Sequence, residues 1–126
     1  MGNYAVIYVL GSALLLTFLA LNVSRLRRAL KIGNGDGANK QLYNAIRSHA
    51  NAFEQLMPFF LLVLAIDQRV PNSTWLLALI SSFLLVRLIH AWGMLGRVFS
   101  FRVVAAGLTY LLYLVAIAFV VALYFL

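Results

Sequence analysis

The chain has 126 residues, 64% of them hydrophobic and 10% charged, whereas a soluble domain uses roughly 45–50% apolar residues. This composition excludes a soluble protein and indicates an integral membrane protein of one domain, because four helices of about 20 residues would fill most of the chain. The net charge of +7 does not indicate a nucleic-acid partner, since the aromatic residues lie mostly within the apolar runs and not among the basic residues.

The first predicted membrane span covers about residues 4–23. No basic segment precedes it and its apolar core is longer than that of a signal peptide, so we expect it to be retained. The helix can continue into the basic cluster SRLRRALK, whose charges mark the membrane surface. Three glycines in IGNGDGANK then end any helix, and the single carboxylate of Asp36 predicts an ordinary turn and not a calcium loop.

The second span, about residues 41–66, begins with the polar segment QLYNAIRSHANAFEQ and ends with the apolar LMPFFLLVLAI. At about 100° per residue, a stripe of about 60° on one helix face holds four side chains, and His49 points the other way. These four are Arg47, Asn51, Glu54 and Pro58. A charged side chain within a bilayer costs about 2.5–3.5 kcal/mol on insertion scales, so this half of the span should face protein and is a candidate site.

The side chains of this stripe suit a zwitterionic, peptide-like ligand. Arginine offers a rigid pair of donors to a carboxylate, asparagine can donate and accept, and glutamate can bind an ammonium group. A structural alternative is that Arg47 and Glu54 neutralise each other within the bundle or between subunits.

The third span, about residues 74–95, carries Arg87 and His90 toward its end, with Met94 one turn further on the same face. All three are therefore directed at one neighbouring helix. We expect no metal site here, because one imidazole without nearby carboxylates is seldom a ligand. A hydrogen-bonded structural histidine is the alternative role for His90.

The fourth span covers about residues 103–126 and is preceded by Arg102, with Ala106, Thr109 and Tyr113 following on its face. The start of a helix already carries partial positive charge, so the helix dipole does not favour an arginine there. Two explanations are open: Arg102 anchors the span at the cytoplasmic surface, or it stabilises the thiolate of a bound thiol. The thiol would have to belong to a ligand, since the chain has no cysteine.

Most basic residues lie in the connection between spans one and two or in that between spans three and four. The bias of basic residues toward the cytoplasm predicts that both connections are cytoplasmic and that both termini lie outside. A small multidrug exporter would also have four short spans, but such exporters require a glutamate in the first span. This first span has no acidic residue, which argues against an exporter.

The sequence resembles the family of membrane-associated proteins in eicosanoid and glutathione metabolism, called MAPEG, over its whole length. The most specific part is RSHANAFEQLMP at residues 47–58. It is supported by RRAL at residues 27–30, RLIH at residues 87–90 and Arg102 before the last span. The GDG turn followed by AIRSHANAFE is most similar to a bacterial inner-membrane branch of the family.

The resemblance implies an all-α, four-helix membrane protomer that assembles as a homotrimer and holds glutathione between adjacent subunits near the cytoplasmic face. Arg102 would hold the glutathione thiolate, which would attack an electrophilic carbon or a peroxide of a lipophilic substrate arriving through the bilayer. Carried over by position, the residues that bind glutathione would be Arg27 or Arg28, Arg47, Asn51, Glu54 and His90.

Several positions depart from the enzymes of this family. Met94 stands where members that make eicosanoids have a tyrosine, and Val103 and Ala106 replace a serine and a tyrosine of the prostaglandin synthase. Tyr110 or Tyr113 could supply a hydroxyl group to the ligand only if the helix is rotated, and on this basis Tyr113 is included among the expected glutathione-binding residues. Two functions are therefore open: a glutathione-dependent transferase or peroxidase, and a lipid or small-molecule binding protein of the same fold without turnover.

Overall fold

The computed structural model describes all 126 residues and contains four helices and no strand. The helices are α1 (Asn3–Leu30), α2 (Lys40–Arg69), α3 (Thr74–Leu95) and α4 (Phe99–Phe125). Each is long and apolar enough to cross a membrane. The prediction of an all-α membrane helical bundle is therefore confirmed.

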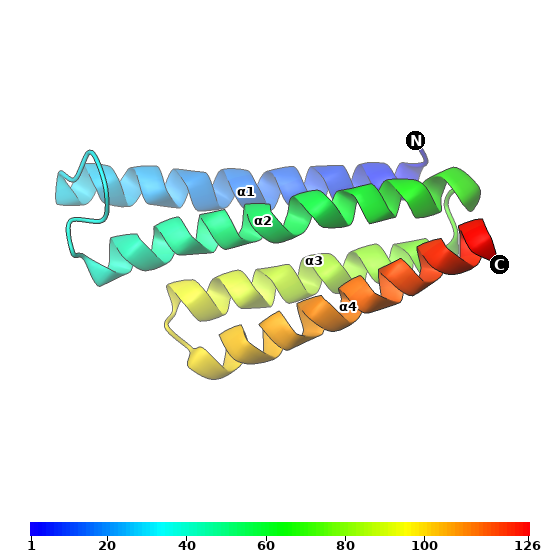
Figure 1. Cartoon of the computed structure of the whole chain (residues 1–126). Helices are drawn as coiled ribbons and strands as arrows, with labels where there is room; N and C mark the ends of the chain where they lie inside the picture. Colours follow the sequence, from blue (N-terminus) through cyan, green and yellow to red (C-terminus); the bar gives the residue numbers. More distant parts are fainter.

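The helices form two antiparallel hairpins, α1–α2 and α3–α4, that lie against each other (Figure 1). Helices α2 and α3 each pack against all three other helices, whereas the backbones of α1 and α4 do not come close to each other. Both termini and the α2–α3 turn lie at one end of the bundle (Figure 1). The α1–α2 and α3–α4 turns lie at the opposite end, which we call the basic end because it carries Arg25, Arg27, Arg28, Lys31, Lys40 and Arg97.

The helices are longer than the predicted spans at the basic end. Helix α1 continues through the basic cluster to Leu30, and α4 begins at Phe99 instead of residue 103. At 1.5 Å per residue, the 30 residues of α2 extend about 45 Å, against about 30 Å for the hydrocarbon core of a bilayer. The helix ends that carry the basic residues can therefore reach beyond the hydrocarbon without breaking the helices.

Side chains and backbone geometry in the connections explain where the helices end. Lys31 adopts the left-handed conformation that ends α1, and Gly35 and Gly37 also have positive φ angles. The Asp36 carboxylate accepts a hydrogen bond of 2.9 Å from the Ala38 amide, so the predicted turn is confirmed. The Asn39 side chain then caps the start of α2.

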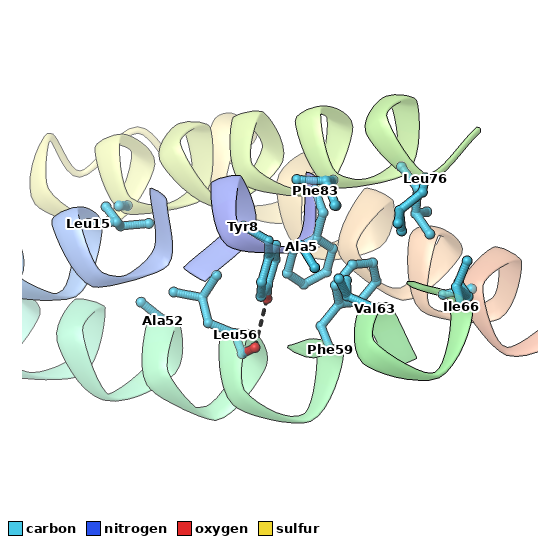
Figure 2. Packing of buried hydrophobic residues seen from close by; sticks show 14 of the residues in the cluster. Ala5, Tyr8, Leu15, Ala52, Leu56, Phe59, Val63, Ile66, Leu76 and Phe83 are labelled. Carbon is cyan, nitrogen blue, oxygen red and sulfur yellow. Dashed lines mark hydrogen bonds between the residues drawn. The ribbon is translucent and has the colours of Figure 1, made fainter. Parts of the chain in front are cut away.

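The core of the bundle lies between α1, α2 and α3 and is rich in aromatic residues (Figure 2). Phe59 of α2 stacks on Phe83 of α3 with ring centroids 3.5 Å apart, and the Tyr113 ring packs edge-on against both. Tyr8 of α1 is buried beside them and donates a 2.7 Å hydrogen bond to the Leu56 carbonyl (Figure 2). These contacts join all four helices at the middle of the bundle.

Pro58 lies inside α2, as the sequence predicts, and the helix passes through it without ending. Proline lacks an amide hydrogen and disturbs the hydrogen bonding of the preceding turn. In this turn the carbonyl groups of Gln55 and Leu56 accept hydrogen bonds from the Tyr113 and Tyr8 hydroxyls. Side chains of α1 and α4 thus supply donors to the part of α2 that the proline weakens, as membrane helices require.

Candidate functional site: a polar cleft between α2, α3 and α4

A polar cleft opens between α2, α3 and the start of α4, toward the basic end. We call this space of about 160 Å³ the outer cleft. Its lining consists of Tyr43, Asn44, Arg47, Asn51, His90, Met94 and Arg102. A second polar space of about 20 Å³, the inner chamber, shares Asn51 and His90 with it and lies deeper in the bundle. The chamber is lined by Asn51, Gln55, Arg87, His90, Ala106, Thr109 and Tyr110.

Arg87 is the central residue of the inner chamber. Only 1% of its surface is exposed, although it carries a full positive charge within a membrane span. Its Nη2 donates a 2.6 Å hydrogen bond to Asn51 Oδ1 and lies 3.2 Å from His90 Nδ1. Its Nη1 donates to Thr109 Oγ1 at 3.2 Å, so Arg87 links three helices.

No carboxylate balances the charge of Arg87. The chain has three acidic residues, of which Asp36 lies in the turn at the basic end, Asp67 lies near the opposite end of α2, and Glu54 is exposed on α2. The Arg87 Nε is buried and has no hydrogen-bond partner. Since a buried charge is normally paired, this arrangement is expensive unless an anion binds nearby.

Thr109 is oriented by its own helix to accept the hydrogen bond from Arg87. Its hydroxyl donates to the Ala105 carbonyl one turn earlier at 2.8 Å, so the hydroxyl hydrogen is used and a lone pair faces the guanidinium. Only 1% of Thr109 is exposed. The position of Thr109 seven residues after Arg102, two turns along α4, explains how one helix lines both the cleft and the chamber.

The outer cleft is electropositive because Arg47 and Arg102 line it and no carboxylate does. Both arginines are exposed at the protomer surface, and the amides of Asn44 and Asn51 add further donors. Such a lining suits an anionic ligand with hydrogen-bond acceptors. Positively charged and donor groups at a concave site are the usual way in which proteins bind carboxylates and phosphates.

Gly93 allows the start of α4 to approach α3 beside this cleft. A Cβ atom at position 93 would lie 2.7 Å from the backbone nitrogen of Arg102 and 3.2 Å from its Cα. Any larger residue would therefore push the backbone of Arg102 away. This close contact between α3 and α4 therefore fixes the position of the Arg102 backbone beside the cleft.

The structure brings four of the predicted site residues together in the outer cleft: Arg47, Asn51, His90 and Arg102. Glu54 is exposed on the same helix but lines neither space. It is two turns from Arg47, about 10.5 Å along the helix axis, so mutual neutralisation within the protomer is not supported. Any such neutralisation would have to act between subunits.

The remaining predicted residues lie away from the cleft within the protomer. Arg27 donates to the carbonyls of Ile32 and Gly35 at 3.3 and 2.8 Å and so holds the α1–α2 turn. Arg28 is exposed on α1. Tyr113 is half-buried, and its hydroxyl donates to the Gln55 carbonyl at 2.5 Å.

Sequence reasoning did not include Arg87, Gln55, Thr109 or Tyr110 among the site residues. The signal for Arg87 was present, since it lies three residues before His90 on one face of α3. Its complete burial and the absence of an acidic partner depend on how α2 and α4 pack around it. Those facts appear only in three dimensions.

A separate apolar groove runs between α1 and α3 on the other side of α3. Its main part has a volume of about 790 Å³ and is lined by residues such as Leu19, Ile89 and Trp92. A further 350 Å³ continues it along the same helices through Leu15, Phe18 and Leu88. The groove shares no lining residue with the polar cleft or the inner chamber.

Comparison with known proteins agrees with the resemblance found in the sequence. The model of the MAPEG family matches residues 5–123. The inner membrane protein YecN of Escherichia coli strain K12 is 34% identical over 97 residues, which cover 76% of this chain and 73% of YecN. The YecN protein of E. coli strain CFT073 matches to the same extent. No solved structure matches the chain.

Proposed function

Because the chain belongs to the MAPEG family, we propose that it is a glutathione-dependent membrane transferase or peroxidase acting on lipophilic electrophiles. The observation that carries this proposal is the outer cleft, in which two guanidinium groups converge with Asn51 and His90 and no carboxylate is present. Glutathione is a peptide with two carboxylates, so it complements this lining in charge and in hydrogen bonding.

The volume of the cleft supports an assembly in which a neighbouring protomer completes the site. Pockets for small molecules usually measure about 300–1,000 Å³, and the 160 Å³ of the outer cleft is sufficient for only part of a tripeptide. We propose that the protein is a homotrimer and that glutathione lies between subunits. Glu54 would bind the ligand ammonium group, and Arg27 or Arg28 would approach from a neighbouring α1.

In the proposed reaction, Arg102 stabilises the glutathione thiolate at the mouth of the cleft. The sulfur forms a bond to an electrophilic carbon of the lipophilic substrate, and the leaving group departs with the electron pair of the bond that breaks. With a peroxide, the thiolate attacks one oxygen, the O–O bond breaks, and the released alkoxide takes up a proton. A second glutathione then reduces the glutathione sulfenic acid to the disulfide and water.

The relatives and the charge distribution support a proposal for the location and orientation. The chain is an integral membrane protein with four spans, and its E. coli relative is named as an inner membrane protein. We propose that it lies in a bacterial inner membrane with the basic end in the cytoplasm and both termini outside. Glutathione would then reach the outer cleft from the cytoplasm, and the lipophilic substrate would reach it from the bilayer.

A titration of the purified protein with glutathione tests the proposal directly. We expect binding by calorimetry and a near-ultraviolet thiolate band, and Arg102→Ala should abolish the band without changing the assembly. Arg97→Ala is the matched control, because Arg97 is exposed in the neighbouring turn and does not line the cleft. An unchanged band in Arg102→Ala would remove Arg102 from the mechanism, and no glutathione binding would refute the function.

The apolar groove favours a second function, that of a lipid-binding protein without turnover. Its main part is large enough for an acyl chain and is almost entirely apolar. Under this alternative, glutathione can bind but forms no thiolate band and no product. Native mass spectrometry would then find retained lipid, and Leu88→Trp, which fills the groove, should reduce the amount of lipid retained.

A further inference from the structure

The hydrogen bonds of Arg87 have a direction that can be deduced from chemistry. A guanidinium group has five N–H donors and no acceptor, and it keeps its proton in proteins. Every polar atom that hydrogen-bonds to Arg87 must therefore present a lone pair to it. Two of these atoms belong to Asn51 and His90, which also line the outer cleft.

For His90 this requirement determines which ring nitrogen carries the proton. Nδ1 lies 3.2 Å from Arg87 Nη2, so Nδ1 must be the acceptor and cannot carry hydrogen. The ring is then neutral, and its single proton is on Nε2. Nε2 makes no hydrogen bond within the chain and is not among the fully buried polar atoms that lack a partner, so it remains open to a ligand.

For Asn51 the same requirement determines the orientation of the side-chain amide. Oδ1 accepts the 2.6 Å hydrogen bond from Arg87, which leaves the NH₂ group on the other side of the amide. Asn51 lines both the inner chamber and the outer cleft. Its two N–H donors have no partner within the chain and are likewise not enclosed.

We infer that Arg87 is a positioning residue that turns Asn51 and His90 into hydrogen-bond donors toward the cleft and thereby makes the cleft selective for an anionic group. Arg87 itself stays beneath the ligand and does not need to touch it. Its uncompensated charge, at 1% exposure, also raises the electrostatic potential of the cleft. The inference rests on the proposed function only for the identity of the anion, which would be glutathione.

The alternative is that Arg87 serves only to hold three helices together. The two roles can be separated by replacing Arg87 with a residue of similar size that can both donate and accept hydrogen bonds. In Arg87→Gln, the glutamine can present either its oxygen or its nitrogen, so neither the tautomer of His90 nor the amide of Asn51 is fixed. A purely structural role predicts that a variant that still folds keeps its affinity for the anion, whichever tautomer His90 adopts.

The first measurement is nitrogen NMR of the histidine rings in the full-length protein, without any ligand. His49 on the opposite flank of α2 serves as the internal reference, and His49→Gln assigns its signal. We expect His90 to be a single neutral tautomer with the proton on Nε2. A proton on Nδ1, or a charged ring near neutral pH, in the unaltered protein would overturn the inference without any need for a variant.

The second measurement is the affinity for glutathione in Arg87→Gln, with Arg87→Lys as the conservative variant. Loss of two fixed donors to a charged group predicts binding about tenfold to a hundredfold weaker in Arg87→Gln. Lysine is also only a donor, so Arg87→Lys should keep the Nε2 tautomer and recover part of the affinity. Unchanged affinity in a folded Arg87→Gln would refute the positioning role, whichever tautomer His90 adopts in that variant.

The two measurements separate the failure of this inference from failure of the proposed function. If the unaltered protein does not bind glutathione but His90 has the expected tautomer, the proposed function fails and the positioning role stands. If glutathione binds and His90 has the other tautomer, the function stands and the role of Arg87 is wrong. Circular dichroism of each variant confirms that it is folded.

Discussion

A pair of substitutions at Arg87 and Thr109 would separate stability from function at the inner chamber. Thr109→Val has nearly the same shape and removes the acceptor for Arg87 Nη1, which lies 3.2 Å from the hydroxyl. A hydrogen bond to a charged group contributes about 1.5–3 kcal/mol, and Thr109 is buried, so solvent cannot replace the lost partner. We expect Thr109→Val to destabilise the protein by about that amount.

Arg87→Met removes the charge together with its need for acceptors. Replacing buried charges by apolar residues of similar size is often neutral or stabilising by about 1–4 kcal/mol, and Arg87 has no carboxylate partner to lose. We therefore expect Arg87→Met to be at least as stable as the unaltered protein. In this background Thr109→Val should cost only about 1 kcal/mol or less, because the interaction with Arg87 is already absent and only the hydrogen bond from the hydroxyl to the Ala105 carbonyl is still lost.

The assay is reversible unfolding of the four proteins of this double-mutant cycle in bicelles, followed by circular dichroism. Glutathione binding is measured on the same samples and should be lost or strongly weakened in Arg87→Met. If Arg87→Met is stable but does not bind glutathione, the positive charge of Arg87 serves function and not stability. If Arg87→Met instead lost more than about 3 kcal/mol, Arg87 would be a structural anchor, and the argument from its missing counterion would be refuted.

Three other substitutions test the fold and the site. Tyr113→Phe should lower stability by about 1 kcal/mol in unfolding experiments, because it removes the hydrogen bond to the Gln55 carbonyl, and should leave glutathione affinity unchanged. Gly93→Ala should reduce the glutathione thiolate band by displacing the Arg102 backbone, whereas Gly107→Ala, whose Cβ would meet no atom within 4 Å, should not. Phe59→Ala should cost about 3–5 kcal/mol, since Phe59 is fully buried against Phe83; a much smaller loss would show that the core can collapse around the cavity.

Much of the fold could be predicted from the sequence because each span is a long apolar run with clear ends. The helix boundaries were the weaker part, since basic residues end the hydrocarbon-embedded segment and not the helix itself. Hydrophobicity placed the membrane surface near Val23 and left room for α1 to continue into the basic cluster, but it could not show that the helix ends at Leu30. The same reason explains why α4 begins before residue 103.

The candidate site was predictable where one helix determines it and less so where several do. Helical spacing placed Arg47 and Asn51 on one face, and both line the cleft. Spacing could not tell that Asn51 points inward to Arg87 while Glu54, a further turn along α2, faces outward. That distinction depends on the position of α3 and α4 beside the stripe.

The exposure of Glu54 supports the proposed assembly. Glu54 is the fifteenth of the 30 residues of α2, so it lies near the middle of a helix that spans the bilayer. An ionised carboxylate facing acyl chains there would cost about 2.5–3.5 kcal/mol on insertion scales. Glu54 lines neither the outer cleft, which holds Arg47 and Arg102, nor the inner chamber, which holds Arg87. A neighbouring protomer can remove this cost by covering the stripe and by bringing a cation, or the ammonium group of a ligand, to the carboxylate. Glu54→Gln should therefore weaken glutathione binding if the ligand neutralises Glu54, whereas it should weaken the assembly if a residue of the neighbouring protomer does.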